Sequence, residues 1–245
     1  MIEQNPIALG RTLEGTIRRY LQASLPVSLK YPRLREEITV ALREKDRLVK
    51  GPFVEALSDF VKAASLKELV TSHPALLHGD FASLPGNEYE RLLHQHQASA
   101  LQTIIGEHQN AIVATGTGSG KTECFLYPIL DSLLKEPDLS QPGVRALLIY
   151  PLNALANDQL YKRIVPLFVD RFRNKGIKVG RYTGLTRRGV SRQNAESEVL
   201  ASDPFFRDQP PHGLGWQSVP DNWLLTRDEM LAQPPHILIT NYAML

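Results

Sequence analysis

The sequence has little cysteine and almost no excess of charge. Its 245 residues include one cysteine, Cys124, so a disulfide within the chain is excluded. A single free cysteine is typical of a reducing compartment, and we expect a cytoplasmic location. The 28 basic and 26 acidic residues give a formal net charge of +2. The protein is therefore not polybasic, and any contact with nucleic acid must depend on where its charges lie.

The sequence also lacks long apolar runs and metal-ligand spacing. No run approaches the roughly 20 apolar residues of a membrane-spanning helix, so we expect no membrane contact. The first five residues contain neither a basic segment nor an apolar core, which predicts that there is no signal peptide. Among the seven histidines, His94 and His96 are two positions apart and do not share a helix face. A metal site formed by these residues is not expected.

A glycine-rich segment stands out in what the sequence does contain. Residues 111–114 are apolar and predict a short buried strand, and a helix is predicted to open at Lys121. Between them lie Gly116, Gly118 and Gly120, which allow the backbone to turn its N–H groups toward one point. A strand, a glycine turn and a helix in this order are typical of a phosphate-binding loop, with the β-phosphate at the positive end of the helix dipole.

The side chains around this loop suit a nucleoside triphosphate and its metal ion. Lys121 is placed to reach the β- and γ-phosphates, and the Thr122 hydroxyl to bind Mg²⁺. Gln97 lies ahead of the loop, and its amide can donate and accept at once, which suits the edge of adenine, although most glutamines are simply exposed. Thr115 stands where the strict pattern has glycine, so the opening of the loop is a variant.

The amino-terminal part of the chain is expected to be helical. Apolar residues recur at helical spacing through residues 7–80 and predict helices whose apolar faces form a core, including a stripe over 53–64. Ser65 is predicted to cap a short helix that begins at the next residue. Residues 82–88 have the composition of a linker, which predicts a helical accessory region over 1–85.

Strands and helices alternate from residue 110 onward. Apolar runs over 144–150 and 237–239, and a third candidate strand within 175–184, are separated by helical patterns. Such alternation predicts a parallel sheet covered on both faces. Residues 185–234 lack clear periodicity and predict a long loop, which is usually functional or mobile.

Polar residues follow the predicted strands. Asn153 is predicted as the N-cap of a helix over 154–164, whose free N–H groups would either hold a nucleic-acid phosphate or belong to an ordinary capped helix. Thr240 and Asn241 stand at the carboxyl end of the last strand, where open α/β sheets place ligands.

A basic stretch follows Thr183 and Gly184. Arg187, Arg188 and Arg192 would lie against a phosphate backbone in one interpretation and belong to a solvated loop in the other. The sequence leaves both interpretations open.

These segments resemble the motifs of superfamily 2 DEAD/DEAH-box helicases. Residues 114–123 resemble motif I, and residues 150–159 resemble motif Ia. Residues 180–184 and 239–245 are similar to the motif Ib region and a later DNA-contacting segment, and 96–100 to the adenine-reading Q-type motif. Nearly the whole chain looks like the start of large bacterial helicases of the MrfA type and of the DISARM and Druantia phage-defence systems.

The resemblance implies an α/β fold, a RecA-like P-loop NTPase lobe with a parallel sheet over 86–245, preceded by the α-helical N-terminal region. It implies ATP and Mg²⁺ as cofactors, with Lys121 and Thr122 as catalytic residues and Thr122 also on the metal. The nucleotide-binding residues would be Gln97, Thr115, Gly116, Thr117, Gly118, Ser119, Gly120, Lys121, Thr122 and Glu123. The nucleic-acid-binding residues would be Pro151, Asn153, Ala154, Thr183, Gly184, Thr240 and Asn241.

The family's next element, a strand ending in Asp-Glu-x-His, is not found before Leu245. Asp228 and Glu229 follow Thr226 and Arg227 rather than an apolar strand, so they are not that acidic pair. We therefore expect an incomplete first lobe that hydrolyses ATP slowly or not at all by itself, because positioning and charge neutralisation at the γ-phosphate are incomplete.

Three functions follow from these observations. The first is the ATP- and nucleic-acid-binding part of an ATP-dependent DNA helicase in DNA repair or phage defence, acting on single-stranded or partly duplex DNA, with RNA not excluded. Its partners would be the missing C-terminal helicase lobe or other subunits. The second is a non-catalytic nucleotide- and DNA-binding regulatory module. The third, a small kinase, fits less well because the sequence has no arginine-bearing lid.

Overall fold

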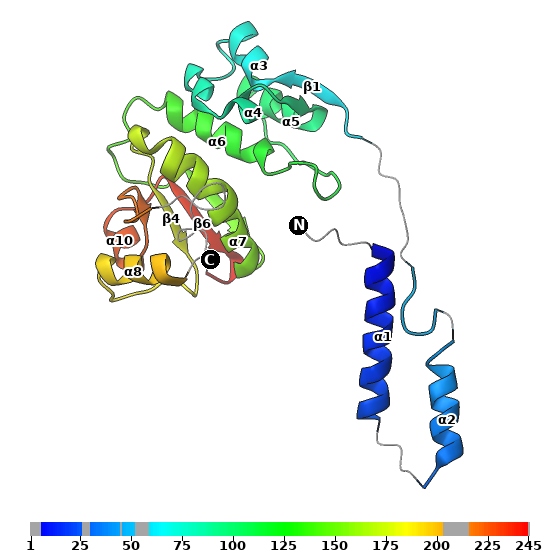
Figure 1. Cartoon of the computed structure of the whole chain (residues 1–245). Helices are drawn as coiled ribbons and strands as arrows, with labels where there is room; N and C mark the ends of the chain where they lie inside the picture. Colours follow the sequence, from blue (N-terminus) through cyan, green and yellow to red (C-terminus); the bar gives the residue numbers. More distant parts are fainter. Residues whose placement is uncertain (1–5, 26–29, 45, 52–58, 203–215, 245) are drawn as a thin grey trace. The chain divides into compact units, whose positions relative to one another are not determined.

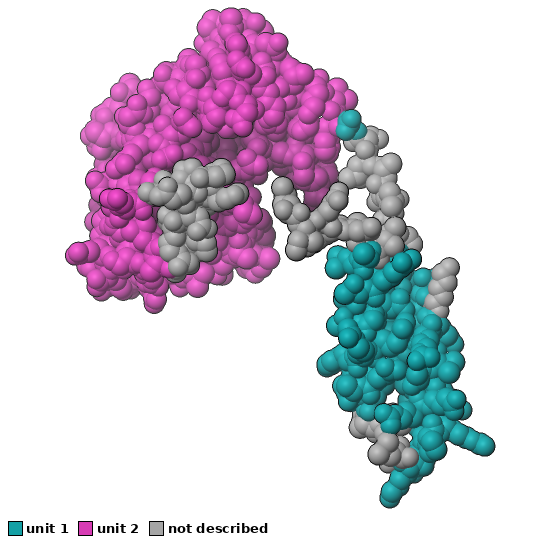
Figure 2. Space-filling model, in the orientation of Figure 1, with its two compact units in different colours: residues 1–59 teal, residues 60–245 magenta. Residues whose placement is uncertain are grey.

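The computed structural model describes residues 6–25, 30–44, 46–51, 59–202 and 216–244. The chain divides into two compact units, Met1–Asp59 and Phe60–Leu245 (Figure 2). The candidate site lies entirely in the second unit.

The first unit contains two helices. They are α1 (Pro6–Ser24) and α2 (Pro32–Ala41), and α2 has proline in its first turn, where the missing N–H costs nothing. Leu9, Leu13 and Tyr20 are 57%, 49% and 69% exposed. The prediction that these apolar stripes form a core is therefore wrong for this unit, because the described residues offer no third surface to cover two helices.

The second unit opens with a small antiparallel pair, β1 (Lys62–Ser65) and β2 (Leu92–His94). The helical stripe expected over 53–64 is wrong at β1, and residues 53–58 lie outside the described part. Ser65 caps α3 (Leu66–Ser72) as predicted: its hydroxyl accepts the Glu68 N–H, and the Glu68 carboxylate accepts the Ser65 N–H at 2.8 Å. The following elements are η1 (Gly79–Ser83), α4 (Gly86–Tyr89), α5 (Gln95–Leu101) and η2 (Gln102–Gly106).

The main sheet has four parallel strands in the order β3-β6-β4-β5. Ile237 and Ile239 of the central strand lie on one face of the sheet and are fully buried, whereas Leu238 on the opposite face is only partly buried. The predicted α/β class with a parallel sheet and a helical N-terminal region is confirmed. The strands are β3 (Ala146–Tyr150), β4 (Val179–Tyr182), β5 (Trp223–Leu224) and β6 (Ile237–Asn241).

Helices cover this sheet (Figure 1). Figure 1 shows α7 on one side of β4 and β6 and the pair α8 and α10 on the other. The prediction of a long loop over 185–234 is therefore wrong for the described residues 185–202 and 216–234, which contain α8, β5 and α10. The remaining elements are α6 (Glu123–Lys135), α7 (Asn153–Gln159), η3 (Leu160–Arg171), η4 (Arg173–Lys175), α8 (Arg192–Ser202), α10 (Arg227–Ala232) and η5 (Tyr242–Met244).

The short strand predicted before the glycine loop is also wrong. Residues 111–114 form no strand, and the Ile112 side chain is 98% exposed. An apolar segment becomes a strand only when another strand satisfies its N–H and C=O groups, and none of the described strands pairs with it. The loop that follows is therefore not anchored by a paired strand before it.

One hydrophobic core joins the helices and the sheet. It contains Leu101, Leu130, Phe168, Val179 and Ile237, each fully buried. Burial of a side chain of this size contributes about 1.5–3 kcal/mol, so this core holds the helices against the strands.

Gly180 in β4 is a close-packed position and provides a test of the core. A Cβ there would lie 2.5 Å from Met230 Sδ and 3.0 Å from the Pro235 ring, whereas a Cβ at Gly184 meets nothing within 4 Å. Gly180→Ala is expected to lower the free energy of unfolding by about 1–3 kcal/mol, because the overpacked neighbours must shift. Urea denaturation measures this, with Gly184→Ala as the control; equal stability of the two variants would contradict the packing.

Candidate nucleotide and nucleic-acid site

The glycine loop is held by two residues in the left-handed region. Gly118 and Gly120 have φ angles of 75° and 74°, which only glycine adopts without strain. Ser119 lies between them and is 1% exposed. Alternating backbone conformations of this kind form an anion-binding concavity of N–H groups. The helix after the loop begins at Glu123, two residues later than predicted.

The Lys121 ammonium closes the loop. Its Nζ donates to the carbonyl oxygens of Thr115 at 2.8 Å and Gly116 at 2.7 Å, and the Thr115 and Ser119 hydroxyls lie 2.6 Å apart. An ammonium makes stronger hydrogen bonds to anionic phosphate oxygens than to neutral carbonyls. The residues of the loop therefore fit a triphosphate, whose oxygens would replace the Thr115 and Gly116 carbonyls as acceptors for Lys121.

Gln97 connects α5 to the loop. Its side chain is 1% exposed; Oε1 accepts the His94 N–H at 2.8 Å, and Nε2 donates to the Gly120 carbonyl at 2.9 Å. The neighbouring His96 Nε2 donates to the Ser119 carbonyl at 2.8 Å. Both ends of the Gln97 amide are thus paired with the protein, and in this structure Gln97 supports the loop instead of presenting an edge to a base.

Polar groups also surround the start of α6. The Thr122 hydroxyl donates to Gln159 Oε1 at 3.2 Å, which places it beside α7. Glu123 is 7% exposed with Oε1 3.4 Å from Arg163 Nη1, while its buried Oε2 has no hydrogen-bond partner among the described residues. Burial and then the Glu123 charge raise the pKa of Cys124 to about 11, so its thiol is unreactive at neutral pH.

The residues expected on the nucleic-acid path gather at the carboxyl edge of the sheet. Asn241 Nδ2 donates to Asn153 Oδ1 at 2.6 Å, and the Thr240 hydroxyl donates to the Tyr182 carbonyl at 2.7 Å. Asn153 is the first residue of α7 and makes no cap, so its predicted N-cap role is wrong; Leu152 occupies that position. The Asn153 side-chain oxygen is used by Asn241 instead.

These residues differ in their access to solvent. Pro151, Ala154 and Gly184 are exposed. Thr183, Thr240 and Asn241 are only 0%, 3% and 7% exposed. A nucleic-acid strand at this edge of the sheet would therefore touch the three exposed residues, while the three buried residues fix the backbone beneath them.

Arg227 holds the turn after β4, and no pattern in the sequence indicated this role. Its Nε donates to the Thr186 carbonyl at 3.0 Å and its Nη2 to the Thr183 carbonyl at 2.9 Å. The guanidinium also lies 5.0 Å from the centroid of the Tyr182 ring, a cation–π contact. These residues are more than 40 positions apart, so no local pattern could have connected them.

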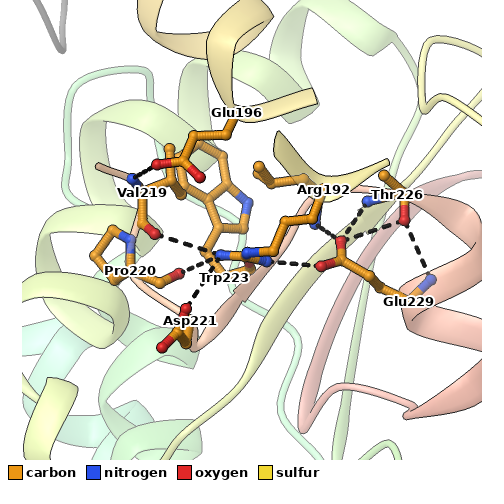
Figure 3. Close-up of polar contacts among 9 residues, drawn as sticks. Arg192, Glu196, Val219, Pro220, Asp221, Trp223, Thr226 and Glu229 are labelled. Carbon is orange, nitrogen blue, oxygen red and sulfur yellow. Dashed lines mark hydrogen bonds and ion pairs between the residues drawn. The ribbon is translucent and has the colours of Figure 1, made fainter. Parts of the chain in front are cut away.

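Arg192 forms a clasp between α8 and the segment around β5 (Figure 3). Its Nη1 donates to Glu229 Oε1 at 2.7 Å and to the Trp223 carbonyl at 3.1 Å, and its Nη2 donates to the Pro220 carbonyl at 3.0 Å. Glu229 in turn accepts the Thr226 N–H at 2.9 Å, within a capping box that begins α10. The partly buried Arg192 side chain is therefore committed to contacts within the fold and is neither a free phosphate ligand nor a fully solvated side chain.

The acidic pair in the first turn of α10, Asp228 and Glu229, is used structurally. Burial raises the pKa of Glu229, but the Arg192 hydrogen bond and the Thr226 and Leu225 N–H groups outweigh it, so the pKa lies below its usual value. Asp228 Oδ2 accepts the Gly189 N–H at 2.6 Å. These contacts agree with the expectation that the pair is not the catalytic acidic motif of the family.

The comparisons with known proteins agree with this geometry. Residues 94–204 match the DEAD/DEAH box helicase family model. The chain is 29% identical over 96% of its length to the Druantia protein DruE of Escherichia coli, covering 16% of that protein. It is 32% identical over 57% of its length to the ATP-dependent helicase MJ1574 of Methanocaldococcus jannaschii, and 29% over 54% to the ATP-dependent helicase HRQ1 of Saccharomyces cerevisiae.

These matches confirm the resemblance to superfamily 2 DEAD/DEAH box helicases that the motifs indicated. The chain spans 19% of MJ1574 and 12% of HRQ1, so it matches less than a fifth of each of the three relatives. In the described part of the chain, no helix is long and apolar enough to cross a bilayer. No group of three His, Cys, Asp or Glu side chains there is arranged to hold a metal ion.

Gly120→Ala tests the backbone of the loop. Alanine there must adopt a positive φ, and its Cβ would collide with Gln97 Nε2, whereas a Cβ at Gly116 meets nothing within 4 Å. Gly120→Ala is expected to cost about 1–3 kcal/mol and to break the Gln97 contact. Thermal unfolding of Gly120→Ala and Gly116→Ala measures the difference, and an unchanged midpoint for Gly120→Ala would contradict the role of the left-handed glycine.

Glu229→Gln tests the clasp and its pH dependence. The pKa of Glu229 is lower in the folded protein than its value of 4.5 in the unfolded chain. The Glu229 carboxylate therefore stabilises the fold at pH values above 4.5, and this contribution is lost as the pH falls through the folded pKa. At pH 7 the variant is expected to be less stable by about 2 kcal/mol, with the difference shrinking below pH 4.5. Urea denaturation from pH 7 to 4 measures this, and a difference that does not change with pH would contradict it.

Proposed function

We propose that this chain is the ATP- and nucleic-acid-binding part of an ATP-dependent DNA helicase. Residues 1–85 would form its helical accessory region and 86–245 its first RecA-like motor lobe, working in the cytoplasm. The observation that carries the proposal is the glycine loop, in which Gly118 and Gly120 turn the backbone around the Lys121 ammonium. The match to the DEAD/DEAH box helicase model includes this loop.

The loop and its neighbours would hold ATP and Mg²⁺. Lys121 would exchange its two carbonyl partners for phosphate oxygens, and Thr122 would exchange Gln159 for the metal ion. When bound, ATP supplies a γ-phosphoryl group whose transfer to water releases free energy. Gln97 and Glu123 flank the loop, and Thr115, Gly116, Thr117, Gly118, Ser119 and Gly120 would surround the phosphates.

The carboxyl edge of the sheet would hold the nucleic-acid strand. Pro151, Ala154 and Gly184 provide its exposed surface, and Asn153 lies at the start of α7, where unpaired N–H groups attract a phosphate. Thr183, Thr240 and Asn241 would keep this edge in shape. The similarity to DruE supports a role in phage defence, and the motif resemblance supports single-stranded or partly duplex DNA as the substrate.

We further propose that ATP hydrolysis by these 245 residues alone is slow or absent. Among the described residues, Thr122 lies next to Gln159 and to Glu123, which is ion-paired with Arg163. Asp228 and Glu229 do not contribute here, because they bind the Gly189 N–H and Arg192. Hydrolysis requires a group that positions water and cations that neutralise the γ-phosphate, which a second helicase lobe or a partner subunit would supply. The same observation favours the alternative of a non-catalytic nucleotide- and DNA-binding regulatory module.

Lys121→Ala tests the nucleotide site. Removal of the ammonium leaves the phosphates without their main cation, so affinity for a fluorescent non-hydrolysable ATP analogue with Mg²⁺ is expected to fall more than about tenfold, or 1.4 kcal/mol. Lys67→Ala, which removes an exposed lysine paired with Glu90, serves as the control. Equal analogue binding by the wild type and Lys121→Ala would overturn the nucleotide assignment.

A single-stranded oligonucleotide titrated with and without the same analogue distinguishes the motor from other functions. A nucleotide-dependent affinity that falls steeply with salt supports the helicase. DNA-stimulated ATP turnover by the wild-type chain, absent in Lys121→Ala, would refute the proposed hydrolysis deficiency. Phosphoryl transfer to a small molecule would replace the helicase with a kinase.

A further inference from the structure

A cavity lined by arginines opens beside the exposed turn after β4. Its volume is about 680 Å³, and Arg181, Arg187, Arg188 and Arg227 line it together with Gly184. We call it the arginine groove. Glu198 is the one carboxylate among its lining residues, so four guanidinium groups face a single negative charge. In a chain whose net charge is only +2, this is a strong local concentration of positive charge.

The four arginines are not equivalent. Arg187 forms a two-pronged ion pair with Glu198, at 2.7 and 3.2 Å. Arg227 is committed to the Thr183 and Thr186 carbonyls, and Arg181 Nη1 donates to the Asn157 side-chain oxygen at 2.5 Å. Arg188 is exposed, and no ion pair or hydrogen bond of its side chain is found among the described residues. Among the described residues, Arg188 is therefore the groove cation that is ready for an external anion.

The walls of the groove are held firmly by the rest of the fold. Arg227 begins α10, the helix that Thr226 and Glu229 cap and Arg192 clasps from α8 (Figure 3). On the other wall, Asn157 belongs to α7, the helix that begins at Asn153. The arginine groove thus shares α7 and the turn after β4 with the sheet edge proposed to bind nucleic acid. A nucleic-acid strand that lies along this edge would continue into the arginine groove.

We propose that the arginine groove binds the phosphodiester backbone of a nucleic-acid strand, with Arg188 pairing directly with a phosphate. Arg181 and Arg227 contribute long-range attraction while they hold Asn157 and the turn after β4. Glu198 limits the affinity by keeping Arg187 occupied. This inference rests on the proposed nucleic-acid function and adds to it Arg188, a phosphate contact that lies outside the helicase motifs quoted above.

Arg188→Gln and Arg173→Gln form a matched pair that tests the groove. Both variants remove one exposed arginine, but Arg173 lies in η4, before the amino end of β4 rather than after its carboxyl end. The probe is a fluorescein-labelled 20-nucleotide oligothymidine, titrated with the whole chain over a series of salt concentrations. Arg188→Gln is expected to weaken binding about three- to tenfold and to reduce the slope of log K against log salt by about 0.7, the share of one phosphate contact. Arg173→Gln is expected to leave both nearly unchanged.

Glu198→Gln tests the same surface in the opposite direction. It releases Arg187 from its ion pair and removes a negative charge, so binding is expected to tighten and the salt slope to steepen. Thermal unfolding and ATP-analogue binding of each variant show that the fold and the glycine loop are intact.

The outcomes separate the groove from the proposed function. If the wild type binds the oligonucleotide with a salt slope but Arg188→Gln and Arg173→Gln behave alike, the groove assignment is overturned and the helicase proposal stands. A wild-type chain that binds the ATP analogue but no oligonucleotide overturns both the groove and the nucleic-acid part of the proposed function.

Discussion

The parallel pairing of β6 between β3 and β4 determines where the candidate nucleic-acid-binding residues lie. Its register places Tyr150 opposite Asn241 and Tyr182 opposite Thr240, so three strands end at one edge. Because parallel strands share a direction, the segments that follow them meet at that edge even when the contacting residues are 58 or 88 positions apart in the chain. The Asn153–Asn241 and Tyr182–Thr240 hydrogen bonds are direct consequences of this register. Without it, the residues proposed to bind nucleic acid would be unrelated side chains on separate segments.

The glycine loop depends on a different kind of constraint, which is local. Left-handed φ angles at Gly118 and Gly120 and the short path from Lys121 back to Thr115 and Gly116 involve only neighbouring residues. This explains why the loop could be predicted from sequence, whereas residues 111–114 could not be assigned correctly. An apolar run indicates that a segment can form a β-strand. Whether it does so depends on a second segment that can hydrogen-bond to its backbone. The same reason applies to Asn153. Its residue type suits an N-cap, but its side-chain oxygen accepts a hydrogen bond from Asn241, which is 88 positions away.

The segment over 185–234 shows what periodicity cannot detect. Its elements, α8, β5 and α10, are short, and no long apolar repeat is needed to hold them because polar contacts do so. Arg192 satisfies backbone carbonyls near β5, and Glu229 accepts both Arg192 and the N–H groups that precede α10. A charge-assisted network of this kind replaces part of the apolar burial that a longer helix would use. From sequence, the same residues looked like a basic loop and an isolated acidic pair.

The arginines of this region carry a more general argument. Arg187, Arg188 and Arg192 lie within six positions, and composition alone treats them as one basic patch. In the structure, Arg187 is ion-paired at the surface, Arg188 is exposed beside the arginine groove, and Arg192 is held in the clasp with Glu229. A guanidinium that already donates to several protein acceptors must lose them before it can bind a phosphate, so its charge contributes little new binding energy. Among the described residues of this cluster, Arg188 has no such partners and offers its full electrostatic attraction to a nucleic-acid phosphate. The contacts of each arginine, rather than the net charge, therefore decide which surface binds nucleic acid.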